Sequence, residues 1–286
     1  IDAFGKGGSL ADISGWLTFT PDHADAARRM RDALVERGVL VANGAEPLAT
    51  YLGAGLGAAT SPAPLADRKV TVVSDAGLGD AVLADLRAAG VGEVRPFSAG
   101  DHAGTNGAAP VSGHHSPALP DEQTLSNCFD GASAVVLAWS TFSPTLFQRV
   151  NGLSLEHGVP WLLGYVDGSE VIIGPSVLPG ESGCYLEYEV QAEASIQQRD
   201  AYHLYREERS QASTARGMVI SPYARVLSGF LSVVLLRMLT GAEVPTLERV
   251  IRVDFERFTV DYQRFLRLPR CPACAVNRAP YRPTFL

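Results

Sequence analysis

A glycine-containing turn follows the apolar run "RKVTVVSD", which ends at Ser74 and Asp75. The next residues are "AGLGD", and the pattern from Leu78 to Ala89 predicts a helix that Gly90 ends. In an open α/β sheet, a first strand, a glycine turn and a helix form a nucleotide site, because glycines let the backbone approach a pyrophosphate at the helix N-terminus. This stretch therefore poses the question of whether the chain binds ATP or NAD.

Two of the four cysteines form a Cys-x-x-Cys pair near the C-terminus, in "CPAC". Such a pair fits half of a tetrahedral zinc site better than a disulfide. A redox pair is less favoured, because Cys271 and Cys274 follow a strand pattern and do not open a helix of a thioredoxin-like unit.

Composition excludes several function classes. The 286 residues carry a net charge of -7, which argues against nucleic acid as a partner, since phosphate binding needs clustered Lys and Arg. The apolar stretch from Val226 to Gly241 is shorter than the roughly 20 residues that span a bilayer and contains Arg237, so it predicts a buried helix and no membrane partner. No signal-peptide pattern opens the chain, which favours a cytoplasmic location.

Periodicity divides the chain into three parts. Residues 1–44 contain helical patterns, one with Ala27, Met30 and Leu34 on a single face; 45–67 is a connector rich in Gly, Ala and Pro; 68–286 is an α/β region. In that region strands and helices alternate up to "PWLLGYV" and "SEVIIGPSVL", a polar helical segment follows from Tyr188, and a strand pair spans Glu248 to Leu268. This order predicts a parallel sheet that finishes in an antiparallel part.

Several of these stretches together resemble a known superfamily. "LRAAGVGEV" and "ASAVVLAWSTFSPTLFQRVNGLSLEHGVPWLLGYVDGSEVIIGPSVLPGESGCYLEYE" are similar to the adenylate-forming ThiF/MoeB and ubiquitin-activating proteins. The closing "LRLPRCPAC" resembles a narrower branch, the ThiF-like partner proteins of YcaO cyclodehydratases, which help to make thiazoles and oxazoles in ribosomal peptides (thiazole/oxazole-modified microcins). The resemblance covers roughly Ser9 to Cys274.

This resemblance implies a Rossmann-like ThiF-type domain with a mostly parallel sheet, preceded by a partial winged-helix unit that recognises a leader peptide. "IDAFGKGGSLADI" and "AARRMRDALVERGVLV" are similar to the last two helices of that unit, whose earlier strands would lie before Ile1. The leader adds a strand beside the last helix, and Arg28, Arg31 and Val35 are the expected peptide contacts. An ordinary surface helix is the alternative interpretation.

The glycine loop departs from the pattern of the active enzymes, which carry Gly-x-Gly-Gly-x-Gly. The matching residues here are Ser74, Asp75, Ala76, Gly77, Leu78 and Gly79, so the first two glycines have become Ser and Ala. Asp75 would repel phosphates at the helix N-terminus. The family's ribose-binding Asp is replaced by "VRPFSAGD", and residues 98–147 contain no Arg or Lys. A degenerate scaffold that binds no nucleotide is the favoured interpretation, in which Gly77 and Gly79 are packing residues.

The family's zinc site has a second Cys-x-x-Cys, and "CYLE" provides only Cys184, with Glu187 in place of the other Cys. The ligand set implied is Cys184, Cys271, Cys274 and Glu187, of which Glu187 is the weakest member because zinc accepts three thiolates and one carboxylate less commonly. Structural zinc and a degenerate site whose thiols merely pack stand as equal alternatives.

The leading hypothesis is a non-catalytic scaffold that binds a precursor leader and presents it to a YcaO-type cyclodehydratase, raising the local concentration of the core peptide at the partner's site. A second copy of the chain is a further candidate partner. The alternatives are an adenylating enzyme that uses ATP and Mg²⁺, with Gly77 and Gly79 as part of a working loop, and, more weakly, an NAD oxidoreductase.

Overall fold

A computed structural model describes residues 21–36, 65–75, 77–98, 119–211 and 219–275. The chain divides near residue 64 into two compact units. In the first unit, the described part is the helix α2 (Pro21–Glu36), so the predicted winged-helix unit over 1–44 lies mostly outside the described residues. The second unit holds the remaining elements.

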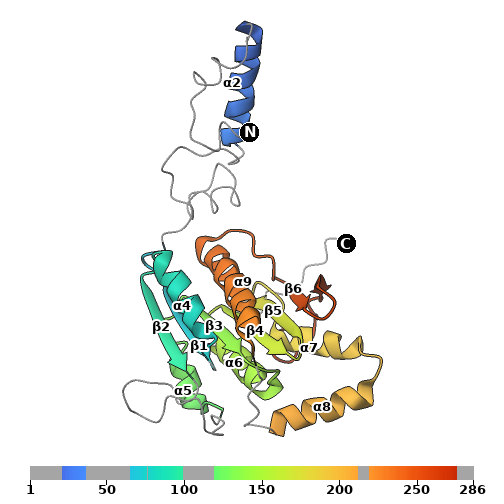
Figure 1. Ribbon diagram of the computed structural model, residues 1–286. Coiled ribbons are helices and arrows are strands. Elements are labelled where there is room, and N and C mark those ends of the chain that lie inside the picture. Colours follow the sequence, from blue (N-terminus) through green and yellow to red (C-terminus); the bar gives the residue numbers. More distant parts are fainter. Residues whose placement is uncertain (1–20, 37–64, 76, 99–118, 212–218, 276–286) are drawn as a thin grey trace, which may run out of the picture. The chain divides into compact units, whose positions relative to one another are not determined.

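The second unit alternates strands and helices along its first half (Figure 1). Its strands are β1 (Lys69–Ser74), β2 (Glu93–Ser98), β3 (Ala134–Trp139), β4 (Trp161–Asp167), β5 (Glu170–Val177), β6 (Arg249–Asp254) and β7 (Thr259–Arg264). Its helices are α4 (Gly79–Ala88), α5 (Glu122–Asn127), α6 (Pro144–His157), α7 (Tyr185–Ala194), α8 (Arg199–Gln211) and α9 (Ser221–Thr240).

One sheet of seven strands forms the centre of this unit, in the order β2-β1-β3-β4-β5-β6-β7. The pairs β1–β2, β1–β3 and β3–β4 are parallel, and the pairs β4–β5, β5–β6 and β6–β7 are antiparallel. The predicted parallel sheet with an antiparallel end is confirmed. The sheet as a whole is mixed, however, and not mostly parallel. Only the four neighbouring strands β2, β1, β3 and β4 are parallel, because β5 and β7 each follow the preceding strand through a hairpin and β6 follows β5 through a long helical connection.

The central strands are apolar along their whole length, as expected for strands covered on both faces. All six residues of β3 are buried, and in β4 six of seven are. Because side chains alternate across a strand, Gly164 faces α9 while Leu163 and Tyr165 lie in the core cluster on the other side. A Cβ on Gly164 would lie 2.8 Å from methyl groups of Leu227 and Leu231, so the glycine lets α9 approach the sheet closely.

Helices cover the sheet in two layers. Figure 1 shows α4 and α9 side by side over one face, and Ser232 of α9 donates a hydrogen bond of 2.7 Å to Asp85 of α4. The other face carries the main core, to which α6 and α7 contribute Phe147 and Tyr185. Asn151 of α6 accepts a hydrogen bond of 2.9 Å from the Tyr185 N–H and thereby fixes the start of α7.

The apolar helix α9 is the one described helix that is long and apolar enough to cross a membrane. Half of its most apolar window is buried inside the protein, and Leu227, Leu231 and Leu235 are fully buried. These contacts confirm the prediction of a buried core helix for this stretch.

The polar segment predicted as helical from Tyr188 is two helices. α7 ends at Ala194, where Ser195 donates its side-chain hydroxyl to the carbonyl of Ala192, and α8 begins at Arg199. The serine competes with the backbone for hydrogen bonds and so favours a helix end. This break between α7 and α8 separates two of the walls of the cavity described below.

Candidate functional site

The strand order reverses at β1, which lies between β2 and β3. In α/β sheets, ligands bind outside the carboxyl ends of the strands at such a switch point. Three polar side chains follow the apolar strands there: Ser74 and Asp75 at the end of β1, and Ser140 directly after β3. The sequence prediction of a strand, a glycine turn and a helix at this place is confirmed by β1 and α4.

The Asp75 carboxylate closes the crevice between β1 and β3. It is 3% exposed and accepts hydrogen bonds from the backbone N–H of Ser140, at 2.7 Å, and from the Ser140 hydroxyl. The backbone N–H of Asp75 also donates to the carbonyl of Ala138, which extends the ladder between the two strands. We expected this carboxylate to face the phosphate position at the start of the helix; instead it is buried and bonded across the switch point.

Ser74 fills the space under the first turn of α4. A Cβ on Gly79 would lie 2.4 Å from the Ser74 hydroxyl oxygen and 2.9 Å from the Ser74 Cβ. Gly79 therefore allows the helix to approach β1, as the packing interpretation requires. Gly77 is required for a different reason. Its φ of +72° lies in the left-handed region, which residues with a Cβ adopt rarely.

The end of β2 is the other part of the expected nucleotide site. The strand ends in Phe97 and Ser98, neither of which is acidic. Ala76 and Asp101 lie outside the described residues.

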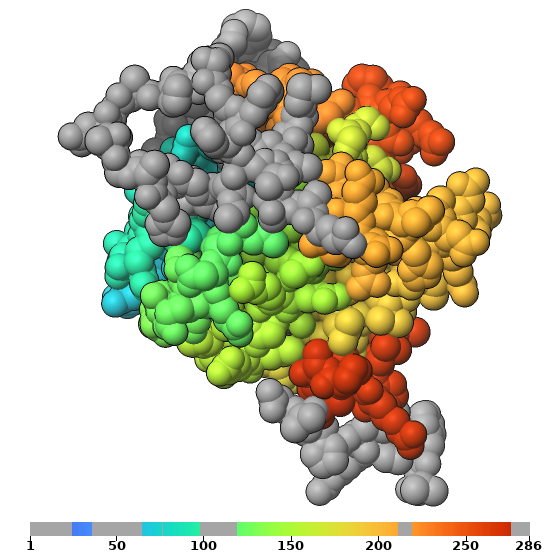
Figure 2. Space-filling model, turned by 90° about the horizontal axis from the view of Figure 1, so that it is seen from below, coloured from blue at the N-terminus to red at the C-terminus, as the bar shows by residue number. Residues whose placement is uncertain are grey.

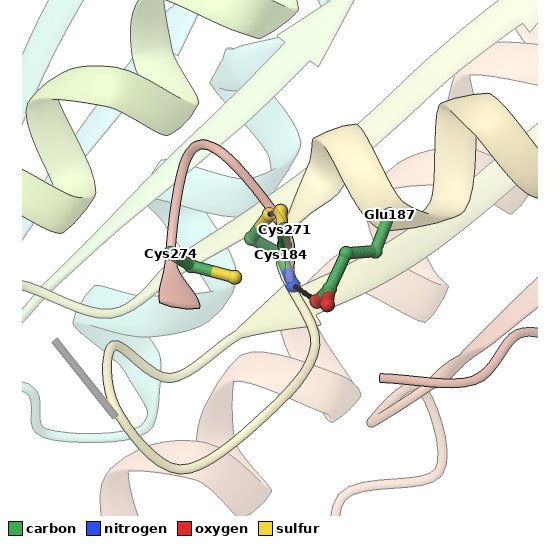
Figure 3. A group of neighbouring side chains, drawn as sticks. All are labelled: Cys184, Glu187, Cys271 and Cys274. Carbon is green, nitrogen blue, oxygen red and sulfur yellow. Dashed lines mark hydrogen bonds between the residues drawn. The ribbon is translucent and has the colours of Figure 1, made fainter. Parts of the chain in front are cut away.

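The three cysteines and the glutamate predicted as a metal site come together at the other end of the unit. Cys184 directly precedes α7, and Cys271 and Cys274 lie in the segment after β7. One potential ligand atom from each of Cys184, Glu187, Cys271 and Cys274 lies within 4.8 Å of all the others, and all four residues are buried. Figure 3 shows the thiols turned toward one another across the two segments.

The spacing of the sulfurs matches metal coordination. Cys184 Sγ and Cys271 Sγ are 3.7 Å apart, and two thiolates on one tetrahedral zinc are separated by roughly 3.8 Å, since each Zn–S bond is about 2.3 Å. Burial raises the pKa of the Cys184 thiol, and it raises the pKa of the Cys274 thiol well above its ordinary range. These two thiols therefore stay protonated without a cation, and a metal ion would supply the positive charge that stabilises thiolates.

Glu187 has a structural role in addition to its place in the cluster. One carboxylate oxygen accepts the backbone N–H of Cys184 at 2.8 Å, which completes a capping box at the start of α7 (Figure 3). The other accepts the N–H of Leu268 at 2.6 Å and so ties the C-terminal segment to the helix. A carboxylate has about four lone-pair positions, so these two bonds leave capacity for a metal ion.

The predicted peptide contacts on α2 share one face of the helix, at i, i+3 and i+7. All three are exposed: Val35 by 53%, and the Arg28 and Arg31 side chains by 57% and 43%. Each arginine pairs with a carboxylate of its own helix, Arg28 with Asp25 and Arg31 with Asp32. Their role in peptide binding stays a prediction.

Sequence reasoning missed Ser140, which holds Asp75. A signal was present, because both residues directly follow apolar runs that predict neighbouring parallel strands, and the carboxyl ends of such strands meet at one edge of the sheet. It also missed α5, although Asp121 caps this helix by accepting the N–H of Thr124 at 2.8 Å, a common N-cap pattern.

No protein-family model and no curated protein matches the sequence. Solved structures do match. E. coli MccB, in a structure that also holds AMPCPP and MccA, is 16% identical with a TM-score of 0.53 over 74% of this chain and 67% of MccB. PaaA is 15% identical with a TM-score of 0.52 over 71% of this chain and 74% of PaaA.

The heterocyclase TruD is 16% identical with a TM-score of 0.54 over 88% of this chain. The match covers 34% of TruD, so this chain corresponds to about a third of that protein. At these identities the likeness shows the fold: the chain shares the α/β fold of MccB, PaaA and part of TruD. The α/β architecture expected from the sequence is therefore one that this chain shares with solved structures.

The Asp75 to Ser140 bonds predict a stability effect. Replacing Asp75 with Ala leaves a buried N–H and a buried hydroxyl without their acceptor, so we expect the free energy of unfolding to fall by roughly 1–3 kcal/mol. Urea denaturation followed by tryptophan fluorescence measures this loss. Asp80→Ala, an exposed change in the first turn of α4, is the matched control, and an equal loss in both variants would contradict the role of Asp75.

Proposed function

We propose that this chain is a non-catalytic scaffold that binds the leader of a ribosomal precursor peptide and presents the peptide to a YcaO-type cyclodehydratase for thiazoline or oxazoline formation. The fold likeness to MccB, whose structure holds MccA, and to the heterocyclase TruD supports a role in peptide maturation. In this proposal the partner supplies the ATP-dependent chemistry, and this chain supplies proximity.

The observation that carries the non-catalytic part is the closed switch point. The Asp75 carboxylate bonds to Ser140 across the crevice, and the Ser74 hydroxyl occupies the space beneath Gly79. A nucleotide loop needs free N–H groups at the start of the helix and room for the phosphates beside them, and the buried Asp75 carboxylate lies in the crevice that leads there. Opening the switch point would place the buried Asp75 carboxylate beside the phosphates. The two negative charges would repel each other, which disfavours nucleotide binding.

Nucleotide binding tests this part directly. We expect calorimetric titration of ATP with Mg²⁺ into this chain to give no saturable heat, because the cradle is filled by its own side chains. E. coli MccB, whose structure holds AMPCPP, is the positive control under the same conditions. Saturable binding with a dissociation constant of about 1–100 μM would favour the adenylating enzyme instead.

The leader-binding part rests on α2. Its exposed face combines two guanidinium groups with an apolar side chain, Val35. In this proposal α2 is the last helix of a winged-helix unit, and the leader adds a strand beside it. Main-chain hydrogen bonds would give affinity, and this face would select the side chains of the leader. The carboxylates of Asp25 and Asp32 hold the two guanidiniums close to the helix until an acidic group of the leader competes for them.

The probes for this part are a precursor leader peptide and a YcaO protein, both to be sought among the genes that neighbour the gene of this chain. We expect the combined change Arg28→Ala, Arg31→Ala and Val35→Ala to weaken leader binding at least about tenfold by fluorescence polarisation, because it removes charge-assisted contacts and apolar area. Arg29→Ala, an exposed arginine on another face of α2, is the matched control. Equal affinity of the triple variant and the control, or failure of the YcaO protein to co-purify with this chain, would contradict the proposal.

We also propose that the buried cluster of Cys184, Cys271, Cys274 and Glu187 holds a structural zinc ion. The sulfur spacing and the burial of all four residues support this assignment. Structural zinc sites are closed and four-coordinate, as this one would be without a water ligand. The ion would join the start of α7 to the C-terminal segment.

Metal analysis of the purified protein tests the zinc proposal. We expect about one equivalent of zinc, lost in Cys271→Ser together with a lower melting temperature, because binding free energy of a structural metal contributes to folding. Cys128→Ser is the control: this cysteine is buried away from the cluster, and its thiol donates to the carbonyl of Thr124. Less than about a tenth of an equivalent in the unchanged protein would leave a degenerate site.

A further inference from the structure

A cavity of about 260 Å³ lies at the carboxyl ends of β3 and β4. Figure 2 shows the molecule from below the view of Figure 1, with α7 and α8, yellow to orange, forming one side of this face. Six of the thirteen lining residues are aromatic and come from β4, α7, α8 and the loop after β3: Phe142, Tyr165, Tyr185, Tyr188, Tyr202 and Tyr205. Two carboxylates and one guanidinium, Asp167, Glu189 and Arg252, also line it.

The rings surround the cavity as a packed group. Phe142 stacks on Tyr205 of α8, with ring centroids 5.9 Å apart and planes 14° apart, and lies 5.8 Å from the ring of Tyr165. Tyr185 and Tyr188 of α7 are 6.0 Å apart on another side. The face of an aromatic ring carries partial negative charge, so rings grouped around one space attract a cation.

Asp167 is the carboxylate in this group that lacks an ion-pair partner among the described residues. It accepts one hydrogen bond, of 2.6 Å, from the Tyr205 hydroxyl, and the guanidinium of Arg209 lies 5.2 Å from the centre of that ring on α8. Burial raises the pKa of Asp167, which the Tyr205 hydrogen bond and Arg209 lower in part. A cation placed beside Asp167 would relieve the cost of keeping this carboxylate charged in a dry site.

The other charges at the cavity are already matched. Glu189 pairs with Arg206 at 3.1 Å and accepts a hydrogen bond of 2.6 Å from Gln148. Arg252 pairs with Glu170 across β5 and β6. Arg252 also lowers the pKa of Asp167 in part, but the two carboxylates and one guanidinium that line the cavity leave an excess of negative charge. A cation is therefore favoured there over an anion.

We propose that this cavity binds an alkylammonium group, held by Asp167 and enclosed by the aromatic rings that line the cavity. The volume lies below the range of about 300–1,000 Å³ that takes drug-sized ligands, so the cavity fits a group the size of one side chain. A lysine side chain of a peptide and a free aliphatic amine share this chemistry. The proposal stands apart from leader binding, because α2 contributes none of the lining residues.

Ligand-observed NMR titration of the full chain tests the proposal with three probes. Nα-acetyl-lysine amide represents a peptide side chain, cadaverine represents a free amine, and the Nε-acetylated form of the lysine probe is the neutral control. We expect saturable binding of at least one amine and at least about tenfold weaker binding of the acetylated probe, because acetylation removes the charge. Tighter binding of the lysine probe identifies a peptide as the source, and tighter binding of cadaverine identifies a free amine.

Variants separate the site from the fold. Asp167→Asn removes the charge and Tyr205→Leu removes a ring from the partly exposed helix α8; each is expected to weaken amine binding at least about tenfold. Asp200→Asn, the same carboxylate-to-amide change at an exposed position of α8 outside the cavity, is expected to bind as the unchanged protein does. The proposal is wrong if neither amine binds saturably, if the acetylated probe binds equally well, or if Tyr205→Leu and Asp200→Asn bind alike.

Discussion

The carboxylate of Asp75 joins the two strands at which the sheet reverses its order. It accepts the N–H and the hydroxyl of Ser140, so the carboxyl ends of β1 and β3 are bonded to each other through a side chain at the point where related folds leave room for a ligand. Ser74 and Gly79 pack against each other next to these bonds, and the serine side chain lies where a Cβ on Gly79 would be. The same contacts join the two strands and bury the Asp75 carboxylate at the switch point.

The two halves of the sheet differ in what their strand ends carry. The parallel half, β2-β1-β3-β4, has the order of a nucleotide-binding fold, and Asp75 and Ser140 are hydrogen-bonded at its switch point. The thiol cluster lies at the start of α7, which follows the antiparallel strand β5. The aromatic cavity spans both halves, because β4 of the parallel half lines it together with β6, α7 and α8.

Local patterns in the sequence were enough to place the strands, the glycine turn and the buried helix α9, because each is set by periodicity and by turn residues over a short range. The thiol cluster could also be anticipated, since the resemblance supplied the pairing of Cys184 with Cys271 and Cys274. Local patterns did not predict that Asp75 pairs with Ser140 or that the helix breaks after Ala194. Ser140 lies 65 positions from Asp75, and only the pairing register of β1 and β3 brings the two together. The tyrosines of the cavity come from separate helices and strands, and nothing in their spacing distinguishes them from ordinary core residues.

The contact between Cys184 and Cys271 encloses a long stretch of chain. Their sulfurs meet across 87 positions of sequence, and α7, α8, α9, β6 and β7 all lie between them. Glu187 adds a second tie over nearly the same span through Leu268, and Gln191 exchanges two hydrogen bonds with the backbone of Leu266. Three walls of the aromatic cavity, α7, α8 and β6, are therefore parts of one closed loop, whose ends limit how far the walls can separate. The contacts at the thiols therefore restrict local opening of the aromatic cavity, although the thiols do not line that cavity.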